Sequence, residues 1–490
     1  MQFTSIPFAF FLPLVFIIYW LLNKNLKIQN ILLLIASYIF YGWWDLRFLF
    51  LLFFISIVNY STGLTIQDAK TRRGRKISLI AGIIANVGVL SYFKYLNFFI
   101  GAFANLFSIF GYTLQKSTLN IILPLGISFY VFLSISYLVD IYRNKLKADK
   151  NIIEVLLTLG FFPIILAGPI QRPVTLLPQI QKKRLFNAEF AADGLRQILW
   201  GLFMKMVVAD NCAVYVNDIF QNFNVYKGST LLVGGILYTI QIYADFAGYS
   251  EIAIGVAKLF GFELMKNFGY PYFAKDITEF WRRWHMSLTS WFRDYIFLPV
   301  SYFVSGKIPN ERILFLKTDL FIYITGILIT WLLTGLWHGA NYTFILWGFM
   351  HGLLLILYQI FKKPRKRLLL KLKIKNTNAL LIGFERVFTL LLIIVTWIVF
   401  RSENRIAAFS YLHKMFSASL FSLPAVFPVT IIGLIIIFIS IEWLQKDKRY
   451  TLDINQIIKN RFLRWSLYYG LIFLIFWFTG NKQQFIYSQF

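Results

Sequence analysis

Long apolar runs recur along this chain with basic clusters between them, and this alternation is what most limits its possible folds. A helix needs about 20 apolar residues to cross the hydrocarbon core of a bilayer. Such runs recur from residues 5–22 to residues 464–480, and the pattern predicts about 11–13 spans. Only 14% of residues are charged, against about 25% in soluble domains. The sequence predicts an all-α polytopic membrane protein, with residues 1–490 forming one domain.

The basic residues indicate how the chain is oriented. The net charge is +27, but the positive residues lie in short loops between apolar runs. Nucleic acid binding would need a soluble basic module, and no soluble stretch is long enough, so we expect anionic lipids as the electrostatic partner. Lys24 and Lys27 follow the first span and no basic residue precedes it, which predicts an N-terminus outside the cytoplasm. The dense run 362–375 is either a topology determinant or an amphipathic helix on anionic headgroups.

Residues 263–318 break the pattern, because they are apolar and aromatic yet carry many charges. Polar backbone survives at membrane depth only where protein or a water-filled cavity surrounds it. We therefore expect short helical or re-entrant elements folded into the protein. Asp276 is placed to cap one of them, with Glu279 completing a capping-box pattern and pairing with Arg283 one turn later.

The arginines of this segment suggest an anion site. Arg282, Arg283 and Arg293 are suited to hold a phosphate group by bidentate hydrogen bonds. Coenzyme A, a phosphopantetheine arm or a lipid headgroup would each qualify. The alternative is that these side chains snorkel to the membrane interface.

Two of the four histidines lie in GLWHGANYTFILWGFMHG, residues 335–352. Ionisable residues within membrane segments are expensive and are functional candidates by default. A buried, neutral His338 is suited to act as a general base; the alternative is a histidine whose imidazole bonds a carbonyl. On one continuous helix His351 would lie too far along the axis to pair with His338 directly, unless Gly339 breaks the helix. We expect that break. The glycines of this stretch let backbone or substrate approach closely, and we expect them to make room for a substrate.

Other catalytic classes find little support. No HExxH, Walker, GxSxG or GxGxxG motif is present, and the histidines have no carboxylates at ligand spacing, so we expect no metal site and no serine nucleophile. Cys212 is the one cysteine, which excludes a disulfide framework. From position alone, His285 fits a surface anchor, and His413 carries no signal.

These residues together resemble a known family. EFWRRWHMSLTSWFRDYIFLPV followed by TGLWHGANYTFILWGFMHG is similar to the membrane-bound O-acyltransferases, most of all to the bacterial branch with the alginate O-acetyltransferase membrane subunit. The stretches NILLLIASYIFYGWWDLRFLFLLF and LAGPIQRP fit as well. The resemblance implies a helical funnel with a tunnel and a buried active site, with re-entrant and interfacial helices beside the spans.

The resemblance also implies roles for single residues. His338 matches the catalytic histidine of the family, and His285 falls where relatives carry a polar partner that orients the donor carbonyl or stabilises the oxyanion. His351 matches a further histidine of the bacterial branch, and Asn341 is a possible supporting residue. Arg282, Arg283 and Arg293 then lie near the phosphates of the donor. No permanently bound cofactor is expected, since acetyl-CoA or another acyl thioester is a substrate.

The implied function is transfer of an acetyl group from a cytoplasmic thioester across the bacterial cytoplasmic membrane to an extracytoplasmic glycan. Transfer is either direct or through an SGNH-type transferase. D-alanyl or lipid acyl transfer from a carrier protein is one alternative. A transporter or flippase with a histidine proton relay is another, although matching halves of the kind common in transporters are not evident.

Overall fold

A computed structural model describes residues 1–111, 119, 121–313, 316–454, 457–480, 483, 485 and 486. The chain divides into two compact units, Met1–Leu202 with Tyr249–Met265, and Phe203–Gly248 with Lys266–Phe490. The prediction of one domain over residues 1–490 stays a prediction.

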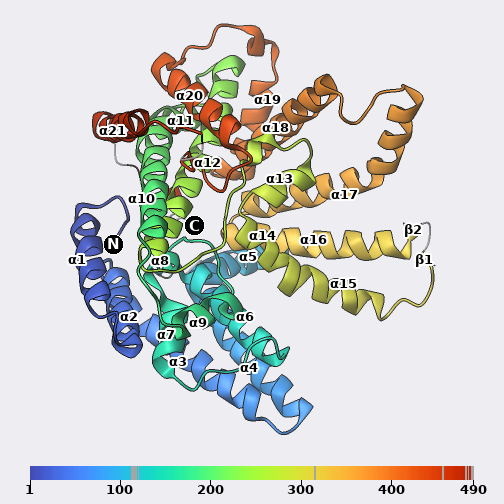
Figure 1. The fold of residues 1–490 in the computed structure, drawn as a ribbon. Helices are drawn as coiled ribbons and strands as arrows, with labels where there is room; N and C mark the ends of the chain where they lie inside the picture. The colour runs from blue at the N-terminus through green and yellow to red at the C-terminus, as the bar shows by residue number, and fades with distance from the viewer. Residues whose placement is uncertain are drawn as a thin grey trace. The chain divides into compact units, whose positions relative to one another are not determined.

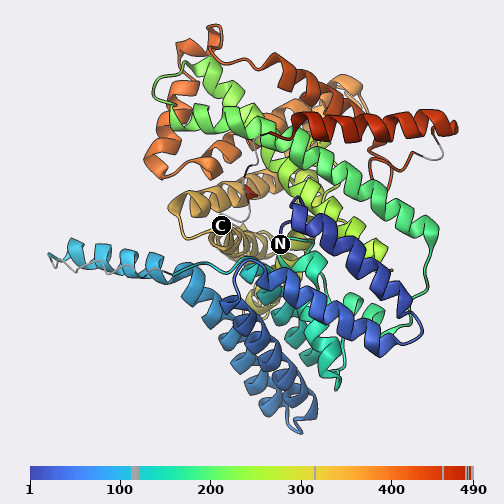
Figure 2. The same cartoon turned by 90° about the vertical axis from the view of Figure 1, so that its left-hand side faces the viewer.

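The first unit is helical (Figures 1 and 2). Helix α1 packs against α2, while α3 packs against α4, α6 and α7. Among the described residues the helices of this unit are α1 (Ile6–Leu21), α2 (Leu26–Gly42), α3 (Arg47–Asp68), α4 (Arg72–Leu90), the π-helical turn η1 (Ser91–Tyr95), α5 (Leu96–Ile109), α6 (Ile127–Tyr142), α7 (Ile152–Gly160), α8 (Phe162–Ile165), α9 (Pro173–Gln181) and α10 (Ala188–Leu202).

The second unit is also mainly helical, with one short antiparallel hairpin that pairs Arg312 with Lys317. Helix α12 (Gly228–Leu259) belongs to this unit as far as Gly248, and its remaining residues belong to the first unit. The other described elements are η2 (Phe203–Ala209), α11 (Asp210–Gln221), η3 (Pro271–Phe273), α13 (Ile277–Arg283), α14 (Met286–Phe292), η4 (Arg293–Phe297), α15 (Leu298–Ser305), β1 (Arg312–Ile313), β2 (Leu316–Lys317), α16 (Thr318–His338), α17 (Tyr342–Lys371), α18 (Ala379–Arg401), α19 (Arg405–Met415), η5 (Ala418–Phe421), α20 (Val429–Gln445) and α21 (Arg461–Phe478).

Local sequence explains where many helices begin. A polar side chain just before the first turn accepts a hydrogen bond from a backbone N–H that has no partner within the helix. This capping interaction is made by Ser5, Asn25, Thr71, Asn151, Asp276, Asn341, Asn378, Asn404 and Asn460.

Seven helical segments of the described chain are long and apolar enough to cross a membrane, and five shorter apolar helices accompany them. The seven are Arg47–Asp68, Arg72–Ile109, Ala188–Gln221, Gly228–Leu259, Thr318–His338, Tyr342–Lys371 and Ala379–Arg401. The prediction of an all-α polytopic protein is confirmed. Because several predicted spans form helices shorter than 18 residues, hydropathy alone counted more full-length spans than the structure has.

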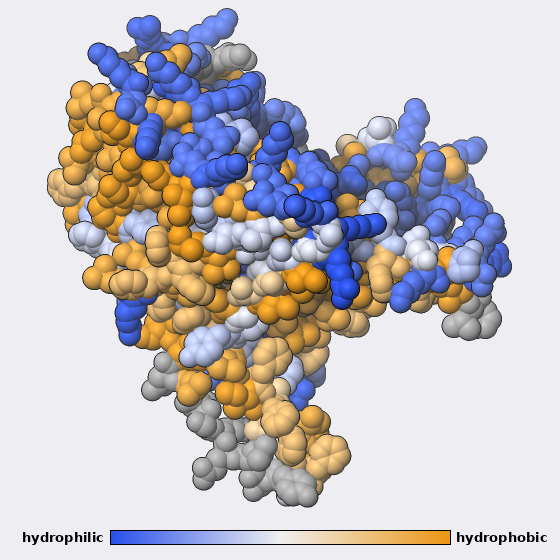
Figure 3. All heavy atoms as spheres, turned by 90° about the horizontal axis from the view of Figure 1, so that it is seen from below, coloured by the Kyte–Doolittle hydropathy of each residue, from blue (hydrophilic) through white to orange (hydrophobic). Residues whose placement is uncertain are grey.

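The outer surface is consistent with a lipid environment. Figure 3 shows broad apolar areas, with polar side chains gathered apart from them. Many large apolar side chains are exposed, among them Phe10, Phe50, Leu380 and Phe476. In water such patches would be unfavourable, whereas in a bilayer they face acyl chains.

The structure resolves two local predictions. Helix α16 ends at His338 and α17 begins at Tyr342, so the expected break at Gly339 is confirmed. The basic run 362–375 does not form a helix of its own, because residues as far as Lys371 continue α17. Its predicted role toward anionic lipid stays a prediction.

Candidate active site

The charged segment after α12 folds into short helices, as expected. Asp276 caps α13, and its Oδ1 accepts a 2.8 Å hydrogen bond from the N–H of Glu279. Glu279 in turn accepts from the N–H of Lys275 and forms a 2.6 Å ion pair with Arg283. Burial raises the pKa of Glu279, but the Lys275 N–H and the Arg283 guanidinium outweigh it and leave that pKa below its usual value.

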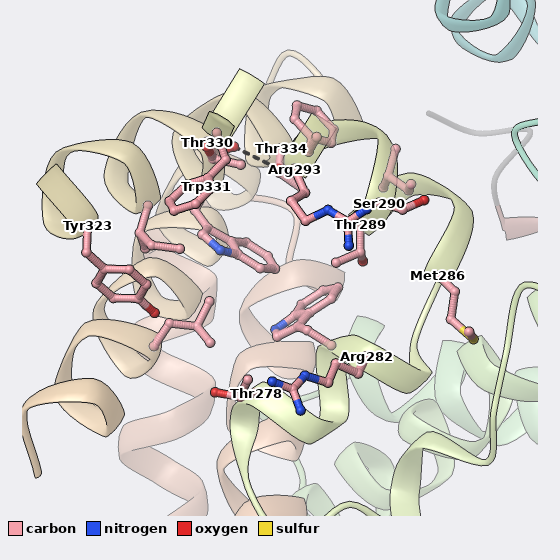
Figure 4. A pocket seen from close by; sticks show the side chains of 16 residues that line it. Thr278, Arg282, Met286, Thr289, Ser290, Arg293, Tyr323, Thr330, Trp331 and Thr334 are labelled. Atoms are coloured by element: carbon pink, nitrogen blue, oxygen red, sulfur yellow. Dashed lines mark hydrogen bonds between the residues drawn. The ribbon is translucent and has the colours of Figure 1, made fainter. Parts of the chain in front are cut away.

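A cavity of about 490 Å³ opens beside these helices, a size typical of small-molecule sites. Its wall combines aromatic and small polar side chains from α13, α14, η4 and α16, together with Leu355 of α17. Figure 4 shows Arg282 and Arg293 around the same space as Tyr323, Thr330 and Trp331. An anionic ligand with an apolar part would find partners for both parts here.

Two of the three predicted donor-binding arginines therefore reach the cavity. Arg282 and Arg293 line it, although Arg293 also forms a 2.8 Å ion pair with its neighbour Asp294. Arg283 is not among the lining residues, and its charge is already paired with Glu279. Its geometry suits a structural role in α13.

His285 lies between α13 and α14 and is fully buried. Its backbone has φ 42° and ψ 53°, a left-handed conformation that costs a non-glycine residue about 1 kcal/mol or more. Its Nδ1 lies 3.0 Å from Oδ1 of Asn267, and Phe246 meets its ring edge-on at 4.6 Å between centroids. Burial lowers the pKa of His285 well below its usual range, so the imidazole is neutral at pH 7. The prediction of a surface anchor from position alone is therefore wrong.

His338 ends α16 and is 3% exposed. Aromatic rings enclose it. Trp337, Trp347 and Phe400 lie at centroid distances of 4.8, 5.0 and 5.0 Å, each near an edge-to-face angle. The site therefore excludes water around the imidazole, which strengthens any electrostatic interaction made there.

One indole connects the two histidines that the sequence singled out. The Trp337 ring lies 6.0 Å from the ring of His285 and 4.8 Å from that of His338. Since the two histidines are 53 positions apart in sequence, only the tertiary packing of the second unit brings them together.

His351 connects this region to the cavity. Its Nδ1 accepts a 3.2 Å hydrogen bond from the indole N–H of Trp281, a residue of the cavity wall. Trp347 contacts His351 at 4.8 Å and His338 at 5.0 Å. Because a tryptophan N–H only donates, the neutral His351 carries its proton on Nε2. His351 is thus placed between Trp281 of the cavity wall and Trp347, which contacts His338.

The side chain of Asn341 forms hydrogen bonds with backbone groups. Its side chain caps α17 by accepting from the N–H of Thr343 at 3.1 Å, and it donates to the carbonyl of Glu403 at 2.8 Å. These bonds position the start of the helix that carries His351.

The glycines of residues 335–352 serve helix packing. A Cβ on Gly335 would lie 2.3 Å from the carbonyl oxygen of Phe344, and one on Gly348 would lie 2.3 Å from that of Trp331. The backbones of α16 and α17 therefore touch at this point. The expectation that these glycines make room for a substrate is wrong, because protein atoms occupy that space.

Sequence reasoning missed a second buried polar cluster. Lys205 Nζ lies 2.7 Å from carboxylate oxygens of both Asp210 and Asp245, and the other oxygen of Asp245 accepts from the N–H of Ile486. Lys205 and Asp245 each fall in a segment that is long and apolar enough to cross a membrane, and ionisable residues in such segments were an available signal. Asn267 had no comparable signal, since nothing in its spacing links it to His285.

Among the residues that the structure describes, no group of three or more His, Cys, Asp and Glu side chains is arranged to hold a metal ion.

Comparison with known proteins places this chain in a family. The family model of the membrane-bound O-acyltransferases matches residues 44–401. The chain belongs to the membrane-bound O-acyltransferase family. It is therefore a multi-pass membrane acyltransferase, and the resemblance read from the histidine motifs is confirmed.

Individual members of the family match most of the chain. A probable alginate O-acetylase of Pseudomonas aeruginosa is 37% identical over 437 residues, which is 89% of this chain and 78% of that protein. A peptidoglycan O-acetyltransferase of Helicobacter pylori is 31% identical over 83% of this chain and 77% of its own length. A teichoic acid D-alanyltransferase of Bacillus subtilis is 31% identical over 51% of this chain and 62% of its own length.

Proposed function

We propose that this membrane O-acyltransferase moves an acetyl group from cytoplasmic acetyl-CoA to an extracytoplasmic polysaccharide. The observation that carries the proposal is the arrangement of His285 and His338 around Trp337. Trp347 contacts both His338 and His351, and His351 accepts a hydrogen bond from Trp281, which lines the arginine-containing cavity.

The cavity suits the donor. Acetyl-CoA has phosphates at one end and an apolar, uncharged thioester arm at the other. Arg282 and Arg293 offer guanidinium groups for the phosphates, while Trp281, Trp331 and Leu355 offer apolar surface for the arm. The donor is a substrate that leaves as the free thiol.

His338 supplies the proton chemistry in this proposal. It takes the proton of the acceptor hydroxyl while the hydroxyl oxygen attacks the thioester carbonyl. A carbon–oxygen bond forms, the carbon–sulfur bond breaks, and the leaving thiolate takes the proton from the imidazolium. An alternative route has the His338 nitrogen carry the acetyl group for one step before passing it to the hydroxyl.

The relatives support an exported acetyl group and an acceptor outside the cytoplasm. Their names specify O-acetylation of alginate and of peptidoglycan, and these proteins match 83–89% of the chain. The acceptor is then a cell-surface glycan, reached directly or through an SGNH-type transferase. D-alanyl transfer from a carrier protein is the second candidate, because a D-alanyltransferase matches 51% of the chain.

The proposed location is the bacterial cytoplasmic membrane, with the N-terminus outside and anionic lipids around the basic loops. The single cysteine, Cys212, is buried, so a Cys212→Ala chain is a suitable background for topology. A cysteine placed at residue 2 of that chain should react with an impermeant maleimide in intact cells. Reaction only after lysis would contradict the orientation.

One experiment separates the donors. The wild type, a His338→Ala variant and a His413→Ala control, whose histidine is exposed, are purified in lipid nanodiscs. Each is given labelled acetyl-CoA or a D-alanyl carrier protein, with an extracted glycan. Acetyl transfer by the wild type and the control but not by His338→Ala supports the proposal. Transfer from the carrier protein alone, or equal acetyl transfer by His338→Ala, contradicts it.

A further inference from the structure

The side chains of Asn267 and His285 face each other, and both are fully buried. The segments around them are joined by backbone hydrogen bonds. The N–H of Met286 donates to the carbonyl of Asn267 at 2.8 Å, and the N–H of Gly269 donates to the carbonyl of Arg283 at 2.8 Å. The Asn267 side chain is therefore held on a rigid frame.

The orientation of the Asn267 amide follows from its neighbours. The backbone N–H of Ser287 points at Oδ1 from 3.3 Å, and the Ser287 hydroxyl donates to the same atom at 2.8 Å. A backbone N–H can only donate, so an amide turned the other way would set its NH₂ group against another donor. The atom facing Ser287 and His285 is consequently the oxygen.

This orientation selects one tautomer of His285. A carboxamide oxygen only accepts hydrogen bonds, and it lies 3.0 Å from Nδ1 of His285. Nδ1 must therefore carry the proton of the neutral imidazole, and Nε2 keeps its lone pair. The left-handed backbone of His285 is the conformation that this network stabilises.

We propose that Asn267 is a positioning residue that fixes the tautomer of His285 and so makes its Nε2 a hydrogen-bond acceptor for a substrate N–H or O–H group in acyl transfer. The inference rests on the proposed function, because it assigns a role to His285 within that reaction. It also changes the role drawn from the family resemblance. An imidazole with its proton on Nδ1 has no N–H at Nε2 to offer a carbonyl or an oxyanion, whereas it can accept a hydrogen bond from a substrate N–H or O–H group while His338 takes the proton of the acceptor hydroxyl.

The tautomer is measured without any substrate. Protein labelled with ¹⁵N-histidine in lipid bilayers is examined by solid-state NMR, and a His285→Gln variant identifies the signals of His285. We expect protonated Nδ1 and unprotonated Nε2 in the wild type, and loss of that pattern in Asn267→Ala. Asn86→Ala is the matched control, because it removes another buried amide that pairs with Asn59 and should leave the His285 signals unchanged. A wild-type His285 with its proton on Nε2 would overturn the proposal.

Turnover then tests the role. In Asn267→Ala we expect kcat to fall about 10–100-fold with a smaller change in KM. In Asn267→Asp a carboxylate replaces the amide, and its negative charge favours the protonated imidazole of His285. The acidic limb of the pH profile of kcat/KM should therefore move about one pH unit toward higher pH. An unmoved limb in Asn267→Asp with full kcat in Asn267→Ala would overturn the positioning role even if the tautomer is found. Absence of acetyl transfer in the wild type would instead count against the proposed function and leave the tautomer result standing.

Discussion

His285 and His338 are both buried in the second unit, yet different interactions surround them. His285 is held by hydrogen bonds, with Asn267 at Nδ1 and Ser287 beside it. His338 is enclosed by the rings of Trp347 and Phe400 at 5.0 Å. The hydrogen bond to Asn267 decides which nitrogen of His285 carries the proton, and the ring contacts of His338 hold its imidazole in place.

The largest effect should come from the ring-enclosed histidine. We expect His338→Ala to lower acyl transfer by about 10²–10⁴-fold, the usual range for losing a general base. Steady-state release of free thiol from the donor measures it. We expect His285→Gln to lower acyl transfer less than His338→Ala does. An equal or larger loss in His285→Gln would contradict the greater importance of His338.

The close contact of α16 with α17 at Gly348 can be tested by measuring the stability of the protein. A methyl group on Gly348 would meet the carbonyl oxygen of Trp331, which belongs to a helix backbone and cannot move aside. We expect Gly348→Ala to destabilise the protein by about 1–3 kcal/mol through overpacking. Thermal unfolding in detergent checks it. Gly383→Ala is the control, since no atom lies within 4 Å of a Cβ there, and it should unfold at the wild-type temperature or above.

The hydrogen-bonded histidine should make stability depend on pH. The folded-state pKa of His285 is well below its usual value, so below about pH 6.5 the unfolded state binds a proton that the folded state does not. Stability is therefore lost as pH falls through that window, by up to about 1.4 kcal/mol per pH unit. Urea unfolding at pH 7 and pH 5 measures this loss. A His285→Gln variant should lose less, and identical losses would assign the effect to other groups.

The smallest effect concerns the hydrogen bond between Trp281 of the cavity wall and His351. Trp281→Phe keeps the ring but removes the N–H that donates to Nδ1 of His351. The buried acceptor then lacks this donor, and we expect a loss of about 1 kcal/mol. Differential thermal unfolding checks the value. The double variant Trp281→Phe with His351→Phe should recover part of the lost stability, because it also removes the imidazole nitrogen that Trp281→Phe leaves without this donor.

Much of this protein can be predicted from the sequence alone, because the relevant physics is local. Runs of apolar residues require a membrane, and in a membrane the backbone must satisfy its own hydrogen bonds within helices. The cap at Asp276, the Glu279–Arg283 pair and the break at Gly339 depend on residues a few positions apart, so their spacing was enough to predict them.

Only the tertiary structure decided which distant residues meet. The pairing of Asn267 with His285, the sharing of Trp337 by two histidines, and the buried Lys205 between Asp210 and Asp245 all join separate elements. The use of Gly335 and Gly348 for helix contact was likewise decided by packing. A sequence states which side chains are present, but the distance between two helices depends on every side chain that fills the space between them.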